Sequence, residues 1–405
     1  MDNANDSHEL PRLVIPPPDA AAASAARERL DSLAKVPGSL GRLETLAVLL
    51  AGMTGQARPR FPRKAVALFA GDHAIARHGL SSTGQEVTAL QTRNFLRGGG
   101  TINAFTRNAG AGLTVVDVGI DGEIDMPDTE AADPAAPIRF VRRKAVRGAR
   151  DFSAGTARDP VWAMTRAETL ACLRAGMDVA FSEADRGMDL LAAGEMGIGN
   201  TSPSSALAAH FLGVPVERVT GAGSGISAAM LQRKTDLLAG ALARHFPAGA
   251  EREPDPVEVL ARVGGPEIAA MSGFMLGAAS RRVPVVVDGF IAAAAACAAT
   301  ALHAGVRNYL IGSHVSVEPG HRLLLEHIGV DPYFDFGLRL GEGTGAALFF
   351  PIIDAAVRVL DEMATLADIG LTLPPQSPQS PQSKGVQDAP AGERDAGSPA
   401  NRARP

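Results

Sequence analysis

The clearest chemical signal in the chain lies in the stretch Arg339–Gly345, whose sequence is Arg-Leu-Gly-Glu-Gly-Thr-Gly. Its glycines let the backbone approach a ligand closely and leave N–H groups for an anion. Arg339 adds a fixed positive charge suited to phosphate. Glu342 would then be a base beside a bound phosphate ester, which indicates chemistry on a phosphorylated sugar. The alternative is a helix N-terminus with glycines and a capping glutamate.

A second glycine-rich turn, Ala193–Pro203, follows an apolar strand and opens a helix. Gly197, Asn200 and Thr201 are candidate contacts for a phosphate or a ribose, since glycine permits close approach and the other two offer donors. The turn is neither a dinucleotide fingerprint nor a Walker motif. Glu195 within it is unusual, because a carboxylate repels phosphate, and it indicates a second role such as holding a base or the ribose. The alternative is an ordinary strand-to-helix turn.

Three weaker signals lie before and between these turns. Gly221–Ile226 is again glycine-rich, and Lys234 follows it by two helical turns, although such a lysine is more often a solvated helix charge. Thr83 and Gln91 are candidates to line a pocket for a flat, apolar base with one polar edge. Asp72-His73 ends the first core strand, and a hydrogen-bonding turn is favoured over a catalytic pair because adjacent strand residues point opposite ways.

Polar residues also end two later strands. Asp288 and Ser316 lie where ligands bind in parallel sheets, so both are candidate phosphate or ribose contacts, with helix capping as the alternative. His314 has no HxH or HExxH partner, and Cys172 and Cys297 stand alone. Acidic residues are not clustered as a magnesium-dependent transfer would need. The sequence therefore predicts a reaction without metal or other cofactor, and a leaving group other than pyrophosphate.

Composition limits the classes of partner. The chain has 405 residues, a net charge of -5 and only 4% aromatic residues, which argues against a nucleic-acid partner. Met1–Leu10 lacks an apolar signal core, and the uncharged run Gly289–Val306 is interpreted as a buried helix between strands, not a membrane span. We therefore expect a cytoplasmic protein.

Hydrophobic patterning alternates between strand and helix. This order predicts an α/β fold with a mostly parallel sheet flanked by helices. Strands are expected at Ala65–Ala70, Leu113–Gly119, Ile138–Arg142, Leu190–Gly194, Val283–Asp288 and Val306–Gly312. Helices are expected at Asp19–Lys35, Gly41–Met53, Thr165–Arg186, Ile226–His245 and Gly265–Ser280, with a loop at Arg147–Asp159.

Five motifs occur in one order along the chain: Val36–Glu44, Gly71–His73, Val116–Asp121, Gly194–Thr201 and Arg339–Gly345. From about Ile15 to Leu373 the chain resembles the nicotinate-nucleotide–dimethylbenzimidazole phosphoribosyltransferases of the cobalamin lower-ligand pathway. Each motif alone is loose, but the ordered set is specific.

The resemblance implies an activity and an architecture. Nicotinate mononucleotide and 5,6-dimethylbenzimidazole would give α-ribazole 5′-phosphate and nicotinate, with inversion at the anomeric carbon. It also implies a homodimer. Each subunit would have a Rossmann-like catalytic domain at 61–345 and a small helical domain from 19–60 and 346–373. Residues 1–18 are expected to form an irregular arm and residues 374–405 a disordered tail rich in Pro, Gln and Ser.

The resemblance also implies roles for individual residues. Glu342 matches the family's general base and Glu195 its second functional carboxylate. Thr83 and Gln91 match base-pocket positions. The positions around the nucleotide phosphate and ribose are matched by Lys234, Ser316, Arg339, Gly341 and Gly343. Three other functions stay open: transfer to another base or to a phenol, a non-catalytic nucleotide sensor, and an oxidoreductase, against which the missing dinucleotide fingerprint counts.

Overall fold

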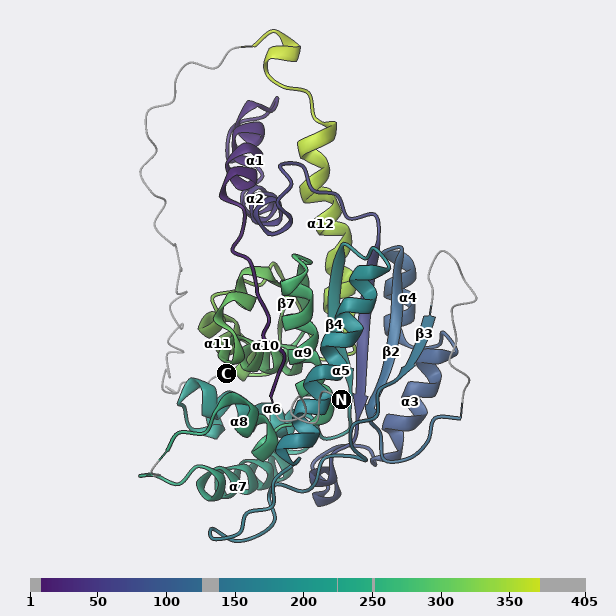
Figure 1. The fold of residues 1–405 in the computed structure, drawn as a ribbon, viewed down its shortest axis with the longest axis vertical. Helices are drawn as coiled ribbons and strands as arrows, with labels where there is room; N and C mark the ends of the chain where they lie inside the picture. The colour runs from purple at the N-terminus through teal and green to yellow at the C-terminus, as the bar shows by residue number, and fades with distance from the viewer. Residues whose placement is uncertain (1–8, 126–137, 224, 250–251, 372–405) are drawn as a thin grey trace, which may run out of the picture.

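The structure is a computed structural model that describes residues 9–125, 138–223, 225–249 and 252–371 (Figure 1). A six-stranded parallel sheet runs in the order β3-β2-β1-β4-β5-β6. Its strands are β1 (Lys64–Gly71), β2 (Ala111–Gly119), β3 (Ile138–Arg142), β4 (Leu190–Met196), β5 (Val285–Val287) and β6 (Leu310–Gly312). The predicted α/β class with a parallel sheet is confirmed.

Every residue of β1 and of β4 is buried, since helices cover both faces of this sheet. The helices are α1 (Ala20–Ser32), α2 (Arg42–Thr54), α3 (Glu86–Leu96), α4 (Thr101–Asn108), α5 (Arg166–Asp185), α6 (Thr201–Leu212), α7 (Ala228–His245), α8 (Pro256–Val263), α9 (Pro266–Ser280), α10 (Phe290–Leu302), α11 (Gly320–Ile328) and α12 (Thr344–Glu362). Short 3-10 helices are η1 (Ala74–His78), η2 (Val216–Arg218), η3 (Ala304–Tyr309) and η4 (Ala367–Ile369).

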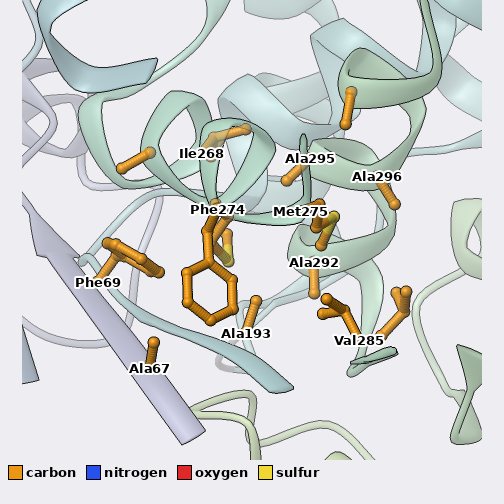
Figure 2. Close-up of a cluster of buried hydrophobic side chains, with 14 of the residues drawn as sticks. Ala67, Phe69, Ala193, Ile268, Phe274, Met275, Val285, Ala292, Ala295 and Ala296 are labelled. Atoms are coloured by element: carbon orange, nitrogen blue, oxygen red, sulfur yellow. The ribbon is translucent and has the colours of Figure 1, made fainter. Parts of the chain in front are cut away.

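The core is densest where α9 and α10 meet the central strands. Phe69 of β1 packs edge-on against Phe274 of α9, with ring centroids 5.5 Å apart. Figure 2 shows alanines of α10 and β4 completing this layer. Small side chains let the helices lie close to the sheet, so the alanine-rich segment forms a buried helix as predicted. None of the helices in the described part of the chain is both long and apolar enough to cross a membrane.

Two glycines let α5 and α9 approach each other at backbone distance. A Cβ atom on Gly176 would lie 1.8 Å from the Ala270 carbonyl oxygen, and one on Gly273 would lie 1.9 Å from that of Leu173. Real Cβ atoms do not come so near an oxygen. This helix pair therefore requires glycine at both positions, and it fixes α9 beneath the sheet.

The two ends of the described chain meet away from the sheet. Ala26 and Leu30 of α1, Ala47 and Ala51 of α2 and Leu360 of α12 form a separate buried cluster. Figure 1 shows these helices together above the sheet. The family resemblance implies a small helical domain built from these two ends, and this division into domains stays a prediction. The boundaries of this domain and of the catalytic domain also stay predictions, and the tail from 374 lies outside the described residues.

The expected strand Val306–Gly312 was wrong in extent, and one small sheet was not predicted. Residues of the run Val306–Gly312 begin in η3, because the His303 side chain accepts a hydrogen bond from the Gly305 N–H and starts a helical turn. Only the last three residues join the sheet. A two-stranded parallel sheet of β7 (His314–Ser316) and β8 (Phe334–Leu338) was not predicted, since its strands are short and most of β8 is exposed.

Candidate active site

A cavity of about 580 Å³ opens at the carboxyl ends of the central strands. This is the position expected for a ligand in an open parallel sheet. Segments from six parts of the chain line it: the η1–α3 turn and α3, the β4–α6 turn, the glycine turn at 223, the start of α10, the segment from β7 to Glu318, and the segment from β8 to α12. Most of the predicted site residues therefore converge at one place.

Glu342 holds a strained position in this cavity. Its φ of 62° is left-handed, an uncommon conformation for a residue with a side chain, and Gly341 and Gly343 beside it both have φ of 82°. A Cβ atom on Gly194 of β4 would lie 2.5 Å from the Glu342 carbonyl oxygen. The glycines thus let the loop turn sharply and press against β4, which points the Glu342 side chain into the site.

The Glu342 carboxylate is suited to accept a proton. It is buried, and its Oε1 accepts a hydrogen bond of 3.1 Å from Gln91 Nε2 on α3. Its Oε2 is buried without a hydrogen-bond partner among the described residues. Burial raises the pKa of Glu342 above the ordinary glutamate value, although the bond from Gln91 opposes this. Gln91 therefore orients one oxygen, and the other has no hydrogen-bond partner among the described residues.

Glu195 lies beside Glu342 at the end of β4. Asn200 Nδ2 donates to Glu195 Oε2, and the Glu342 N–H lies 3.4 Å from Glu195 Oε1. The pKa of Glu195 is raised to about 8, chiefly by burial, with smaller contributions from the negative charges of Glu267 and Asp288 and against the hydrogen bond from Asn200. Glu195 is therefore largely protonated near neutral pH.

The structure assigns Asp288 the capping contact that the sequence left as an alternative. Its Oδ2 accepts from the Gly343 N–H at 3.2 Å and its Oδ1 from the Ala346 N–H at 3.0 Å. The expectation that the glycine-loop N–H groups are free for an anion is therefore wrong for Gly343. Asp288 still lines the cavity, at the start of α10. It ties the loop that carries Glu342 to the end of β5.

The predicted phosphate and ribose residues are mostly brought together. Those that line the cavity are Gly197, Asn200, Thr201, Ser316, Arg339 and Gly341. Gly343 lies behind the lining. Lys234 also lies behind it, fully buried, and donates to Thr201 Oγ1 at 2.8 Å. The interpretation of Lys234 as a solvated helix charge was wrong, because α7 packs this face against α6.

The two base-pocket residues have different placements. Gln91 lines the cavity, whereas Thr83 is exposed in the turn before α3 and is not among the lining residues. Ser81, two residues earlier, does line it. The role of Thr83 in base binding stays a prediction. Apolar walls that the sequence did not single out are supplied by Leu80, Met196, Ile198, Phe290, Ile291 and Leu340.

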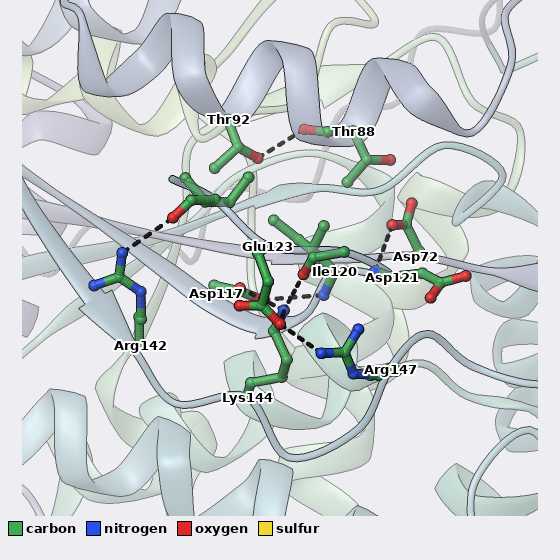
Figure 3. Close-up of polar contacts among 12 residues, drawn as sticks. Asp72, Thr88, Thr92, Asp117, Ile120, Asp121, Glu123, Arg142, Lys144 and Arg147 are labelled. Carbon is green, nitrogen blue, oxygen red and sulfur yellow. Dashed lines mark hydrogen bonds and ion pairs between the residues drawn. The ribbon is translucent and has the colours of Figure 1, made fainter. Parts of the chain in front are cut away.

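The motif around Asp72 and the motif Val116–Asp121 form a hydrogen-bonded support outside the cavity lining (Figure 3). Asp72 Oδ2 accepts from the Asp121 N–H at 2.8 Å, and Asp117 Oδ1 accepts from the Ile120 N–H at 3.0 Å. His73 pairs with buried Glu267 instead, at 2.7 Å. The predicted hydrogen-bonding turn is confirmed.

Comparison with known proteins decides the family. The phosphoribosyltransferase family model matches residues 15–371. A protein of Desulforudis audaxviator named nicotinate-nucleotide–dimethylbenzimidazole phosphoribosyltransferase is 45% identical over 358 residues, which are 88% of this chain and 96% of that protein. The chain belongs to this family. A relative of the same name from Roseiflexus sp. is 46% identical, with 88% of this chain and 96% of the relative covered.

Solved structures agree with the family assignment. A crystal structure of the enzyme of this name from Thermus thermophilus superimposes with a TM-score of 0.78 at 40% identity, covering 88% of this chain and all of that one. The resemblance drawn from the five ordered motifs is thereby confirmed.

In the described residues of this family member, no group of three or more His, Cys, Asp or Glu side chains is placed to hold a metal ion.

Glu318 is a charged residue of the site that sequence reasoning missed. Glu318 lines the cavity between β7 and α11, and its Oε1 accepts from the Gly223 N–H at 2.9 Å. It stands two residues after Ser316, which was selected, but it belongs to no glycine-rich turn. The usable signal was its place at a strand end, just before a proline and a helix.

Proposed function

We propose that the protein transfers the phosphoribosyl group of nicotinate mononucleotide to 5,6-dimethylbenzimidazole, giving α-ribazole 5′-phosphate and nicotinate. The reaction would serve nucleotide-loop assembly in cobalamin biosynthesis. Family membership supports the substrates, since the relatives carry both in their name. The observation that carries the proposal is the buried Glu342 carboxylate at the glycine-lined cavity: Gln91 holds one oxygen, and the other has no hydrogen-bond partner among the described residues.

The chemistry suits these residues. In the mononucleotide, nicotinate is a cationic pyridinium and thus an activated leaving group. The ribose passes through an oxocarbenium-like state, as in glycoside hydrolysis. One nitrogen of the benzimidazole attacks C1′ as the bond from C1′ to the nicotinate nitrogen breaks, and the other N–H becomes acidic. Glu342 takes that proton, which requires its carboxylate form.

Orientation is expected to supply much of the rate. Attack on the face opposite the leaving nicotinate inverts the anomeric carbon from β to α. Arg339, Thr201 and the backbone of Gly197 are proposed to hold the 5′-phosphate at the start of α6, where the helix dipole favours an anion. The apolar wall is proposed to hold the flat benzimidazole against Gln91. Holding both substrates in line converts their encounter into an intramolecular step.

Other parts of the proposal concern the protein's setting. A homodimer and a cytoplasmic location follow from family resemblance and composition, with small molecules as the substrates and no nucleic-acid partner. Neither metal nor other cofactor has a role in the proposed chemistry, because the positive charge of the pyridinium already activates the leaving group. Size-exclusion chromatography with light scattering tests the dimer directly.

The proposed reaction is tested by chromatography of purified protein with both substrates in the presence of EDTA. Formation of nicotinate together with an α-ribosyl phosphate product is the expected result. Product only with another base or a phenol would revise the acceptor and leave the mechanism intact. Tight nucleotide binding without turnover over a panel of acceptors would refute the transferase and favour a nucleotide sensor.

A further inference from the structure

Glu318 is a buried carboxylate to which the proposed chemistry gives no task. The residue is 8% exposed, follows β7 and precedes α11 in the chain, and lines the cavity. Its Oε1 accepts the Gly223 N–H, and its Oε2 is buried without a hydrogen-bond partner among the described residues. A carboxylate beside a phosphate site repels the ligand, so its presence needs a reason.

The glycine turn before α7 is shaped around this side chain. A Cβ atom on Gly221 would lie 2.1 Å from Glu318 Oε2 and 2.8 Å from Pro319 Cδ, so a larger residue would displace the turn. Gly223 has a left-handed φ of 54°, and a Cβ atom there would lie 3.1 Å from Thr201 Oγ1. The turn is thus fitted between Glu318 on one side and Thr201 on the other.

Lys234 completes the arrangement from the far side of the turn. It is fully buried, and its ammonium donates to Thr201 Oγ1 at 2.8 Å and to the Gly221 carbonyl at 3.3 Å. No carboxylate among the described residues forms an ion pair with it within 4.0 Å. Burial lowers the pKa of Lys234 to about 8, and the negative charge of Glu318 opposes this.

We propose that Glu318 is a positioning residue that holds the Gly221–Gly223 turn and the charged form of Lys234, and thereby builds the anion-binding end of the cavity. The inference deepens the proposed function and rests on it. Glu318 acts through the turn and through Lys234, which reaches the ligand by way of Thr201. The elements packed against α7 also carry His210 on α6 and Glu217 and Arg218 on η2, and the charge that raises the Lys234 pKa against burial is that of Glu318.

Two variants separate the two tasks of Glu318. Glu318→Gln keeps an oxygen for the Gly223 N–H but removes the charge, whereas Glu318→Ala removes both. Nucleotide binding without acceptor is measured by calorimetry from about pH 6 to about pH 10, the range that spans the Lys234 titration. Glu326→Ala, at an exposed position of α11, is the matched control. Circular dichroism shows that each variant is folded.

Glu318→Ala is expected to weaken nicotinate mononucleotide binding at least about tenfold, as expected for losing one hydrogen bond to a charged group. At low pH, Glu318→Gln is expected to bind the nucleotide nearly as tightly as the parent protein does. As the pH rises, its affinity should fall at a lower pH than that of the parent protein, because Lys234 loses its proton earlier. In both, kcat at saturating nucleotide should stay within about threefold, since ground-state binding alone is lost. The Michaelis constant for the base should not change.

If Glu318 only repelled the phosphate, Glu318→Ala would bind the nucleotide more tightly instead of more weakly, and this makes the test decisive. Binding as tight as in the parent protein, or tighter, would overturn the inference. An unchanged pH midpoint in folded Glu318→Gln would overturn it as well, as would loss of kcat with unchanged nucleotide affinity. A parent protein that neither binds nor turns over the nucleotide would refute the proposed function and this inference with it, so the two failures are distinguishable.

Discussion

Replacing Glu342 by glutamine separates proton transfer from nucleotide binding. The variant amide has nearly the volume of the carboxylate, and its oxygen still accepts the hydrogen bond that Gln91 Nε2 donates at 3.1 Å. The amide nitrogen takes the place of Oε2, which has no partner in the described residues. The variant should therefore fold and bind nucleotide, but it has no group that accepts a proton from the base.

The size of the effect follows from that single loss. A positioned general base contributes about 10²–10⁴-fold, which corresponds to about 3–5 kcal/mol of transition-state stabilisation. We expect kcat for Glu342→Gln to fall by that factor, while the dissociation constant of nicotinate mononucleotide changes less than about threefold. The backbone φ of 62° at this position is equally strained for glutamate and for glutamine, so it adds nothing to the difference in kcat.

The assay combines chromatographic turnover with calorimetric binding over a range of pH. The base must be deprotonated, and burial raises the pKa of Glu342, so parent activity should fall in acid at a higher pH than for an exposed glutamate. This acid limb should disappear from the residual activity of Glu342→Gln. A variant with kcat within threefold of the parent protein, or with the same acid limb, would refute the assignment of Glu342 as base.

Three further predictions concern the site and the core. The pKa of Glu195 is raised to about 8 in the folded protein, so between its unfolded pKa and pH 8 the folded state holds a proton that the unfolded state has lost. The free energy of unfolding should therefore fall by about 4 kcal/mol from pH 5 to pH 9. Urea unfolding of Glu195→Gln should show no such fall with pH. Gly194→Ala should lower kcat at least about tenfold, because the new Cβ atom would lie 2.5 Å from the Glu342 carbonyl oxygen and displace it. The control Gly240→Ala on α7, whose Cβ atom would meet only the flexible Arg244 side chain, should keep full activity in the same assay. Gly273→Ala should reduce the free energy of unfolding by about 1–3 kcal/mol or more, since its Cβ atom would lie 1.9 Å from a carbonyl of α5; an unchanged urea midpoint would contradict the close helix packing.

The sequence was sufficient for the order of the elements and for most of the site. Strand-to-helix alternation is a local pattern, and parallel strands bring their carboxyl ends to one edge, so the turn at Gly194–Thr201 was expected at a ligand-binding edge. The structure brings the stretch Arg339–Gly345 to the same edge, where Glu195 and Glu342 are in contact across 147 positions of the chain.

Tertiary structure decided what each polar residue does at that edge. Asp288 caps α12, Lys234 is buried behind Thr201, and Glu318 holds a glycine turn more than ninety residues away in the chain. No local pattern separates a capping carboxylate from a ligand contact, or a buried lysine from a solvated one, because burial and partners come from distant segments. Sequence alone therefore determined which residue types reach the site. The fold determined their protonation, their partners and which of them face the cavity.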